Sequence, residues 1–538
     1  SETVKAEAAG TDITVLNEAE ALEGELDLFL GNISFSEEDG KLTILYSKTD
    51  GSGQVVTARL IDQSYDKCYR ITSSGNNVEK YHLSVDIPAS RELKLVLKNL
   101  TITPAEAIAP IQINGESQVT TYLEGKNKIS INKSEKSSSP AGISVAKGAK
   151  LTIDNELGQQ GSIEVLNNTN VTRSGAAIGG NGEQDAGIIH IKGGTVSATS
   201  ASKGAAIGAS VGKSVEEIWI SGGNVTAKSS GGAGIGTGGA FRNEERTGKI
   251  VIEGGTVNAS SWSGAGIGSG YGHAPGSSAI IAKIEIHGGM ITAYSYDGAC
   301  IGSGRDSSSS VLIDGGTICL VKKNNESGRN AAHIGKGYES TQAPTDVTIT
   351  GGTICLIGAD RNIPRPIIYG WEKAGEKWQK NTAKDGNGKP VYFTTADLTG
   401  IYENNTLVEK AGIEGSTYGF KDVRTDSSGR LYMYLPASKA VKASFGGVEF
   451  TGKVEAGKDE NVLEREQTSI DYQREVLKNT ALYELEYAQS RDSASWTKIP
   501  VGGPLSSDRS RASSEWESSQ MRRTTMDMMM TAKMASVA

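Results

Sequence analysis

Three aromatic side chains and one lysine are the residues of this chain best suited to binding a ligand. Counted from the first glycine of a repeated Gly-Gly pair, Trp262 and Tyr296 lie eight residues on, whereas Lys228 and Tyr294 lie six residues on. Alternate side chains of a strand share a face, so all four are expected to point outward. Exposed aromatic rings with a polar group are typical docking points for sugars and protein partners. We predict a binding face here, unless the insertion 271–279 or the N-terminal segment covers the rings.

A second outward column contains Trp219. At matching positions of successive repeats stand His190, Trp219, Val251, Glu285 and Leu312. Trp219 beside Val251 is unusually apolar for a surface in contact with water. Ligand binding and covered packing both fit this pattern, and Trp219 is therefore retained as a candidate ligand-binding residue.

Three other residues could hold a metal ion. Glu253, His287 and Asp314 each precede Gly-Gly in three consecutive repeats, with Glu285 nearby. Carboxylates on adjacent strands, about 5 Å apart, can share a Ca²⁺, which prefers oxygen ligands. The imidazole between them weakens this case. We predict solvated corner residues and no cofactor, with Ca²⁺ as the alternative.

One pair of residues resembles catalytic machinery. Arg305-Asp306 follows a Gly-Ser-Gly corner, and enzymes that cleave polysaccharides use carboxylates together with a second acidic or basic group. No acidic residue at a matching offset of a neighbouring repeat completes the site. We predict a protein that is not an enzyme. The alternative is a polysaccharide lyase or hydrolase acting near Arg305, Asp306, Asp314 and His287.

The elements that position these residues come from an internal repeat. A Gly-Gly pair begins a short β-type run at residues 193, 222, 254, 288, 315 and 351, and an Ile-Gly pair accompanies it at 178, 207, 235, 267, 301 and 334. Between them apolar and polar residues alternate, which is typical of strands, and no stretch has helical periodicity. A unit of about 30 residues that recurs in this way stacks on copies of itself.

Strands that return to one position in every repeat must pair in parallel. The sequence therefore predicts an all-β protein, a right-handed parallel β-helix with three short strands and three corners per turn. Weaker copies such as Leu93–Ile102 and Lys150–Ile153 extend it toward residue 60. Gly234–Gly238 resembles part of a dinucleotide fingerprint, but a strand follows it, not the helix that nucleotide binding requires.

The rest of the chain divides into smaller parts. We predict an N-terminal capping segment at 1–60, with helical character over 13–23 and strands at 42–46 and 55–60. The β-helix follows at 61–369, then a small β-sandwich-like domain at 370–460 and the start of an Ig-like β repeat at 461–505. The tail 506–538, rich in Ser, Arg and Met, is predicted to be disordered or an artificial extension.

Composition excludes several functions. The net charge of −8 and the lack of a Lys/Arg cluster in the repeats argue against nucleic-acid binding, and no apolar run is long enough to span a membrane. We expect a monomer. The chain begins at Ser1 without a signal peptide, and its composition favours a processed or truncated secreted protein. Cys319 and Cys355 hold the same position in adjacent repeats, so they form either a disulfide or two stacked thiols.

The segments Gly254–Ala259, Gly264–Gly270 and Thr425–Pro436 carry a resemblance. They resemble glycine-rich β-helix repeat surface proteins of Gram-positive, often gut-dwelling, bacteria, many of the carbohydrate-binding or adhesin type. The resemblance covers about residues 90–500 and implies a location outside the cell. It also implies a ligand that is a host glycoprotein, such as an immunoglobulin, or a polysaccharide. We therefore predict a secreted or cell-surface adhesin, with a purely structural stalk as a further alternative.

Overall fold

The computed structural model describes residues 15–18, 24–155, 160–240, 246–272, 280–321, 331–338, 345–358, 365–402 and 404–466. The chain divides into two compact units, Ser1–Glu464 and Arg465–Ala538, and the features below belong to the first. The predicted tail 506–538 and residues 467–505 of the predicted Ig-like repeat lie outside the described residues. The described residues form strands, turns and loops without an α-helix. Among them we find no helix with the length and apolarity needed to cross a membrane.

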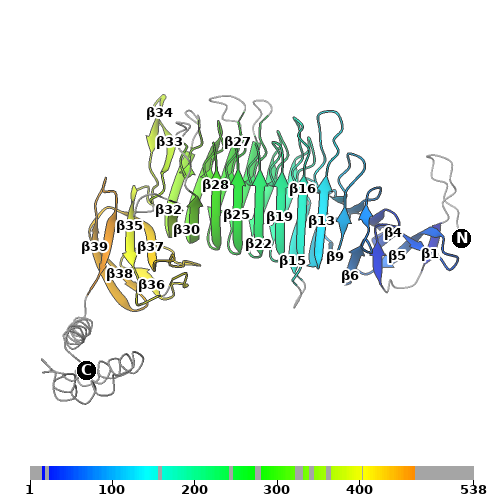
Figure 1. The fold of residues 1–538 in the computed structure, drawn as a ribbon, viewed down its shortest axis with the longest axis horizontal. Helices are drawn as coiled ribbons and strands as arrows, with labels where there is room; N and C mark the ends of the chain where they lie inside the picture. The colour runs from blue at the N-terminus through cyan, green and yellow to red at the C-terminus, as the bar shows by residue number, and fades with distance from the viewer. Residues whose placement is uncertain are drawn as a thin grey trace, which may run out of the picture. The chain divides into compact units, whose positions relative to one another are not determined.

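Three columns of parallel strands run along the body of the molecule, one strand per column in each coil (Figure 1). The first column comprises β2 (Glu25–Asp27), β6 (Cys68–Thr72), β9 (Glu92–Lys98), β12 (Gln118–Glu124), β15 (Lys150–Asn155), β18 (Ala186–Ile191), β21 (Val215–Ile220), β24 (Arg246–Ile252), β27 (Ile280–Ile286) and the first halves of β30 (Ser308–Val321) and β32 (Thr345–Ile357). The second comprises β7 (Asn77–Val78), β10 (Thr101–Ile102), β13 (Lys126–Ile131), β16 (Ser162–Asn167), β19 (Thr195–Ser200), β22 (Asn224–Ser229), β25 (Thr256–Ser261), β28 (Met290–Ser295) and the second halves of β30 and β32. The third comprises β3 (Ile33–Glu38), β8 (Leu83–Asp86), β11 (Ile111–Ile113), β14 (Ile143–Val145), β17 (Ile178–Gly179), β20 (Ile207–Gly208), β23 (Ile235–Gly236), β26 (Ile267–Gly268), β29 (Ile301–Gly302), β31 (Ile334–Gly335) and β33 (Ile368–Ala374).

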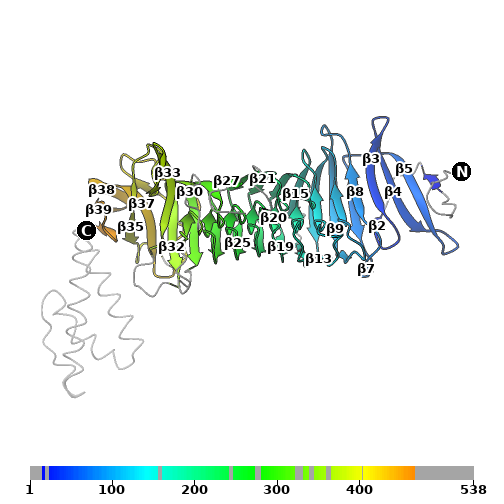
Figure 2. The same cartoon turned by 90° about the horizontal axis from the view of Figure 1, so that it is seen from above.

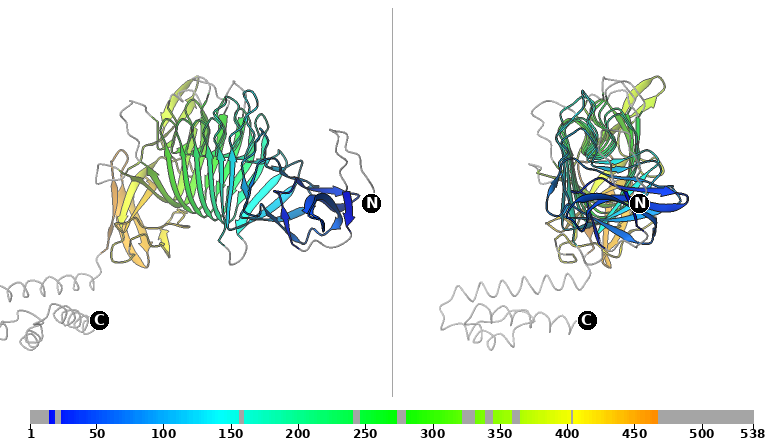
Figure 3. Two further views of the ribbon diagram at one scale, coloured as in Figure 1. Left: turned by 45° about the vertical axis from the view of Figure 1, so that its right-hand side comes forward. Right: turned by 90° about the vertical axis from the view of Figure 1, so that its right-hand side faces the viewer.

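The columns enclose one continuous apolar core. Its inward side chains come from all three columns, and the isoleucines of the Ile-Gly pairs, such as Ile207, Ile235 and Ile267, are fully buried. In the end view of Figure 3 the coils superpose, as expected when each coil covers the core of the one before. The fold is therefore the predicted right-handed parallel β-helix, and the repeat supplies its core one layer at a time.

The repeated glycines form the corners. The second residue of each Gly-Gly pair has a positive φ of 79–89°, a conformation that disfavours other residues. The glycine of each Ile-Gly pair has a φ of 113–139°, and a Cβ added there would lie 1.9–2.2 Å from a carbonyl oxygen of the next coil. Glycine is thus needed at both corners for neighbouring coils to approach each other.

The N-terminal part adds an antiparallel layer to the first coils (Figure 2). β3 pairs with β4 (Lys41–Thr49), which pairs with β5 (Val55–Gln63), as expected from the strand patterns at 42–46 and 55–60. The helical prediction over 13–23 is wrong for Val15–Glu18, because these residues form β1 and pair in parallel with β5. Since β2 and β3 already pair with β6 and β8, the stack begins before residue 61.

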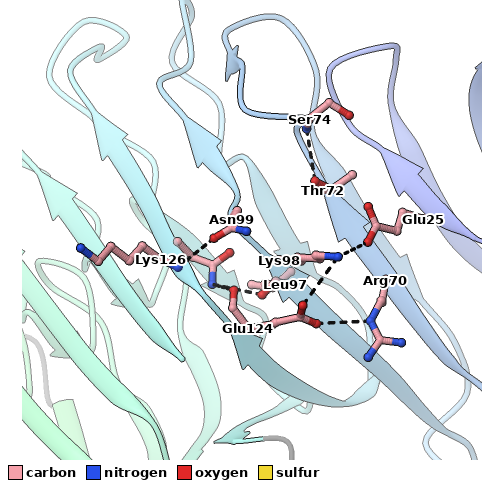
Figure 4. Close-up of polar contacts among 10 residues, drawn as sticks. Glu25, Arg70, Thr72, Ser74, Leu97, Lys98, Asn99, Glu124 and Lys126 are labelled. Atoms are coloured by element: carbon pink, nitrogen blue, oxygen red, sulfur yellow. Dashed lines mark hydrogen bonds and ion pairs between the residues drawn. The ribbon is translucent and has the colours of Figure 1, made fainter. Parts of the chain in front are cut away.

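Ion pairs link the first coils on their outer surface (Figure 4). Lys98 lies opposite Glu124 in the next coil, and their side chains are 3.6 Å apart. Glu124 also accepts from Arg70 at 3.3 Å, and Lys98 pairs with Glu25 at 2.5 Å. Charges of opposite sign in successive coils therefore neutralise each other on this part of the surface.

The C-terminal strands build a small β-domain with its own core. They are β35 (Val391–Asp397), β36 (Ala411–Ile413), β37 (Arg430–Pro436), β38 (Ser438–Phe445), β39 (Val448–Val454) and β40 (Asn461–Arg465). They form one six-stranded sheet. β40 pairs with β35, so residues 461–465 complete this domain rather than open the predicted Ig-like repeat. Before it, β33 and β34 (Lys377–Asn381) form a hairpin at the end of the stack.

A segment of the small domain lies on the Gly-Gly corners of the last coils. Gly316 donates its N–H to the Lys421 carbonyl at 2.7 Å, and Gly352 donates to the Gly419 carbonyl at 2.8 Å. The buried Tyr418 hydroxyl donates to the Gly352 carbonyl at 2.8 Å. Main-chain and side-chain groups of the small domain therefore both bond to the β-helix.

Candidate functional site

The register of the strands places the predicted binding residues. Lys228 on β22 lies opposite Ser260 on β25, which lies opposite Tyr294 on β28, so these residues form one outward column. Lys228 is exposed and Tyr294 is half-buried. Burial is the main cause that raises the pKa of the Tyr294 phenol.

Trp262 and Tyr296 form a stacked pair just beyond the ends of β25 and β28. Their ring centroids are 4.2 Å apart and the planes differ by 15°. Trp262 remains 57% exposed, the highest exposed fraction among the large exposed hydrophobic side chains. In the preceding coil, the position of Trp262 is taken by Ser230, which Gly231 follows. The face of the Trp262 ring that points away from Tyr296 therefore lies beside small residues. The pair thus presents an indole in a fixed orientation.

A second ladder of side chains runs along the neighbouring corner. The guanidinium of Arg305 lies 5.7 Å from the centre of the Tyr271 ring and 5.5 Å from the centre of the Tyr338 ring. Lys203 approaches the same Tyr271 ring, with its ammonium 5.6 Å from the centre. Such distances are typical of cation–π contacts.

Glycines make room for Lys203 to reach Tyr271. A Cβ added at Gly231 would lie 2.9 Å from Lys203 Cγ, and one added at Gly239 would lie 3.2 Å from Lys203 Cβ. The lysine stem therefore lies across a coil that has no side chain at these two positions. Aromatic rings and cations alternate along this corner over successive coils.

Main-chain hydrogen bonds join the two corners directly. Tyr271 donates its N–H to Gly231, Arg305 donates to Ser263 and Tyr338 donates to Asp297, at 2.9–3.0 Å. Ser263 and Asp297 directly follow the two stacked aromatic residues. We call the combined surface of Trp262, Tyr271, Tyr296, Arg305 and Tyr338 the aromatic edge.

Trp219 lies in the first strand column, on β21, apart from the aromatic edge. Its ring stacks on His190 at 3.8 Å, and its indole N–H donates to Glu253 at 2.9 Å. Val251 beside it is buried. Burial, followed by the charges of Lys150 and Lys192, lowers the pKa of His190 to about 4. Trp219 therefore has packing partners of its own.

The candidate metal ligands bond to neighbouring side chains. His287 Nδ1 is 2.8 Å from Asp314 Oδ1, its Nε2 is 3.6 Å from Glu285, and Glu253 accepts from Trp219. In the part of the chain that the structure describes, no group of three or more His, Cys, Asp or Glu side chains is arranged to hold a metal ion. Ca²⁺ binding gains no support from this arrangement.

The candidate catalytic residues lie at two different corners. Asp306 is 3% exposed and its carboxylate is 3.5 Å from the Arg305 guanidinium, beside the aromatic edge. His287 and Asp314 lie at the Gly-Gly corner, next to Gly289, whose N–H donates to Asp422 of the small domain. The four residues do not form one cluster.

Lys203, Tyr271 and Tyr338 were not predicted as members of the site, although the sequence carries a signal for the two tyrosines. Tyr271, Arg305 and Tyr338 each stand four residues after the isoleucine of an Ile-Gly pair. Counted from Gly-Gly, Tyr271 and Arg305 both lie 17 residues on, so that count also aligns them, whereas Tyr338 lies 23 residues on because the segment before its Ile-Gly pair is longer.

Comparison with known proteins agrees with this architecture. Four segments of the stack, residues 189–211, 218–239, 250–271 and 284–305, match a family model described as a beta helix repeat. Neither the curated proteins nor the solved structures include a match to this chain. The matched segments are β-helix repeats, in agreement with the fold, and the function of the chain rests on its own surface.

Proposed function

We propose that this chain is a secreted or cell-surface binding protein of the adhesin type, not an enzyme, that presents the aromatic edge to a macromolecular ligand. The ligand is a glycan, carried on a host glycoprotein such as an immunoglobulin or present as a free polysaccharide. The observation that carries the proposal is the stacked pair of Trp262, 57% exposed, and Tyr296. Tryptophan and tyrosine are enriched at interfaces, and an exposed stacked pair offers a flat apolar surface on which a sugar ring can dock.

The backbone around the rings supports a binding role. The main-chain bonds between the two corners hold the ring-bearing residues in place before a ligand arrives. A ligand that stacks on such rings loses less free energy to ordering the protein. Where such a ring is a hot spot of an interface, its truncation to alanine costs about 2 kcal/mol or more of binding free energy.

The test measures binding of the full chain to a glycan array and to proteins captured from mucosal secretions. Trp262→Ala with Tyr296→Ala is expected to lower the affinity for the captured ligand at least tenfold. The melting temperature is expected to stay the same, because Trp262 is exposed and the half-buried Tyr296 is not part of the hydrophobic core. Phe29→Ala is the matched control, since Phe29 is an exposed aromatic residue outside the edge.

Unchanged affinity in the double variant would remove the aromatic edge from consideration. Absence of any ligand would favour a structural stalk. The release of sugar from a bound polysaccharide, abolished by Asp306→Ala, would contradict the non-enzymatic proposal.

A further inference from the structure

We infer that the aromatic edge selects acidic polysaccharides, whose sugar rings stack on Trp262 while their acidic groups pair with Lys203, Lys228 and Arg305. This inference rests on the proposed function and names the class of ligand. The acidic group is a carboxylate or a sulfate, because both offer the oxygen atoms that lysine and arginine bind.

The cations lie in coils on both sides of Trp262 along the β-helix. Lys228 belongs to the coil before Trp262, in the column that leads through Ser260 to Tyr294. Lys203 comes from the coil before that and reaches the Tyr271 ring. Arg305 follows in the coil after Trp262, bonded through its N–H to Ser263. A chain that stacks on Trp262 therefore meets a cation in either direction.

The acidic residues at the two corners are withdrawn from the surface. The acidic residues there are Asp297 and Asp306, which are 2% and 3% exposed. This holds for the described segments 201–204, 230–232, 262–264, 269–272, 296–298 and 303–306. On the outer face of the first coils, Arg70 and Lys98 both pair with Glu124 of a later coil (Figure 4). In these segments Lys203 and Arg305 balance Asp297 and Asp306 in number, and Arg305 pairs with Asp306. Because both carboxylates are buried and Lys228 is exposed, the charges that a ligand meets at this surface are positive, on a chain whose net charge is −8.

The rings prepare the cations for a ligand. Tyr271 lies between the Lys203 ammonium and the Arg305 guanidinium, which restricts both side chains before binding. At physiological salt, charges act over about 8 Å. Only acidic groups on sugars close to the edge will therefore gain from these cations, whereas the net negative charge of the chain repels polyanions elsewhere.

The test compares three polymers with one backbone: dextran, carboxymethyl-dextran and dextran sulfate. Binding to the full chain is measured by surface plasmon resonance in 150 mM NaCl. We expect one or both charged polymers to bind at least tenfold more tightly than dextran. Lys203→Gln with Lys228→Gln should remove most of this preference, and Lys126→Gln, an exposed lysine on another coil, should leave it unchanged. The polymer that gains more tells whether carboxylate or sulfate is preferred.

The outcomes separate this inference from the proposed function. Equal affinity for all three polymers, or absence of binding to the charged ones, would overturn the inference. So would a preference that survives the double lysine variant, because the responsible charges would then lie elsewhere. If Trp262→Ala weakens the binding of neutral and charged glycans equally, the proposed function of glycan binding still holds. Glycan binding that ignores Trp262→Ala would refute both.

Discussion

The glycine of the Ile-Gly pair allows a quantitative prediction at Gly268, which lies between Trp262 and Tyr271. Its φ is +139°, and a Cβ there would lie 1.9 Å from the Gly302 carbonyl oxygen and 2.9 Å from Ile284 Cδ1. The strained backbone costs about 1–3 kcal/mol for a residue with a side chain. The overlap must separate the two coils and weaken the bonds Ser269 N–H to Gly302 O and Thr237 N–H to Gly268 O, each 3.0 Å long. At about 1 kcal/mol for each bond, Gly268→Ala should cost about 3–5 kcal/mol.

Gly40→Ala provides the matched control. Gly40 also has a positive φ, +76°, but an added Cβ would meet nothing within 4 Å. Strain alone should cost about 1–2 kcal/mol there. Urea unfolding followed by tryptophan fluorescence compares the two variants. Hydrogen exchange of residues 262–272 detects local opening, which a stacked repeat permits. If Gly268→Ala lost no more stability than Gly40→Ala, close packing of coils would not be the reason for glycine in the motif.

Three further predictions concern single layers of the stack. The side chain of Asn127 is buried, accepts a hydrogen bond from Leu100 N–H and donates one to the Leu97 carbonyl. Asn127→Ala should therefore lower the free energy of unfolding by about 2–3 kcal/mol in urea titrations. A loss below about 0.5 kcal/mol would contradict this prediction. His190 has a folded-state pKa of about 4, below its ordinary value of 6.5, so the folded state favours the neutral ring. Its contribution to the free energy of unfolding should be complete above pH 6.5 and should fall as the pH decreases toward 4. Urea unfolding at each pH measures this dependence, and His190→Phe should flatten it between pH 6.5 and 4. An unaltered slope in the variant would refute the lowered pKa of His190. The Cys319 and Cys355 sulfurs are 3.9 Å apart on paired residues, so mild oxidation should join them in a disulfide. Peptide mapping should detect the cross-link, and urea unfolding should show a gain in stability of about 3–4 kcal/mol. Failure of the two peptides to cross-link would contradict this prediction.

The aromatic pair could be predicted because the coils stack in register. Ser260 pairs with Tyr294 without a bulge between β25 and β28, so counting from Gly-Gly placed Trp262 and Tyr296 side by side. Differences in repeat length fall outside these two strands. The same counting gave the column of Trp219 and Val251 on the opposite side of the Gly-Gly corner.

Other contacts had no comparable signal in the sequence. Several bonds between the small domain and the β-helix join main-chain groups, such as the bond from Gly316 to the Lys421 carbonyl, and main-chain groups are the same whatever the residue. The pairing of β40 with β35 joins segments far apart in the sequence, which alternation alone cannot reveal. Strand patterns thus gave the elements of the C-terminal part and not their partners.

A β-helix suits the proposed ligand because both are periodic along one direction. Neighbouring coils repeat about every 4.8 Å, so each binding residue recurs or varies at a fixed interval along the edge. The close stacking of coils that these glycines allow also removes the backbone freedom that a flexible loop would lose on binding. Several weak contacts from Lys228 through Trp262 to Arg305 can then act together on one extended polymer, whereas a small ligand would use only one of them. The affinity should therefore rise with the length of the glycan until the chain spans these coils, and then level off.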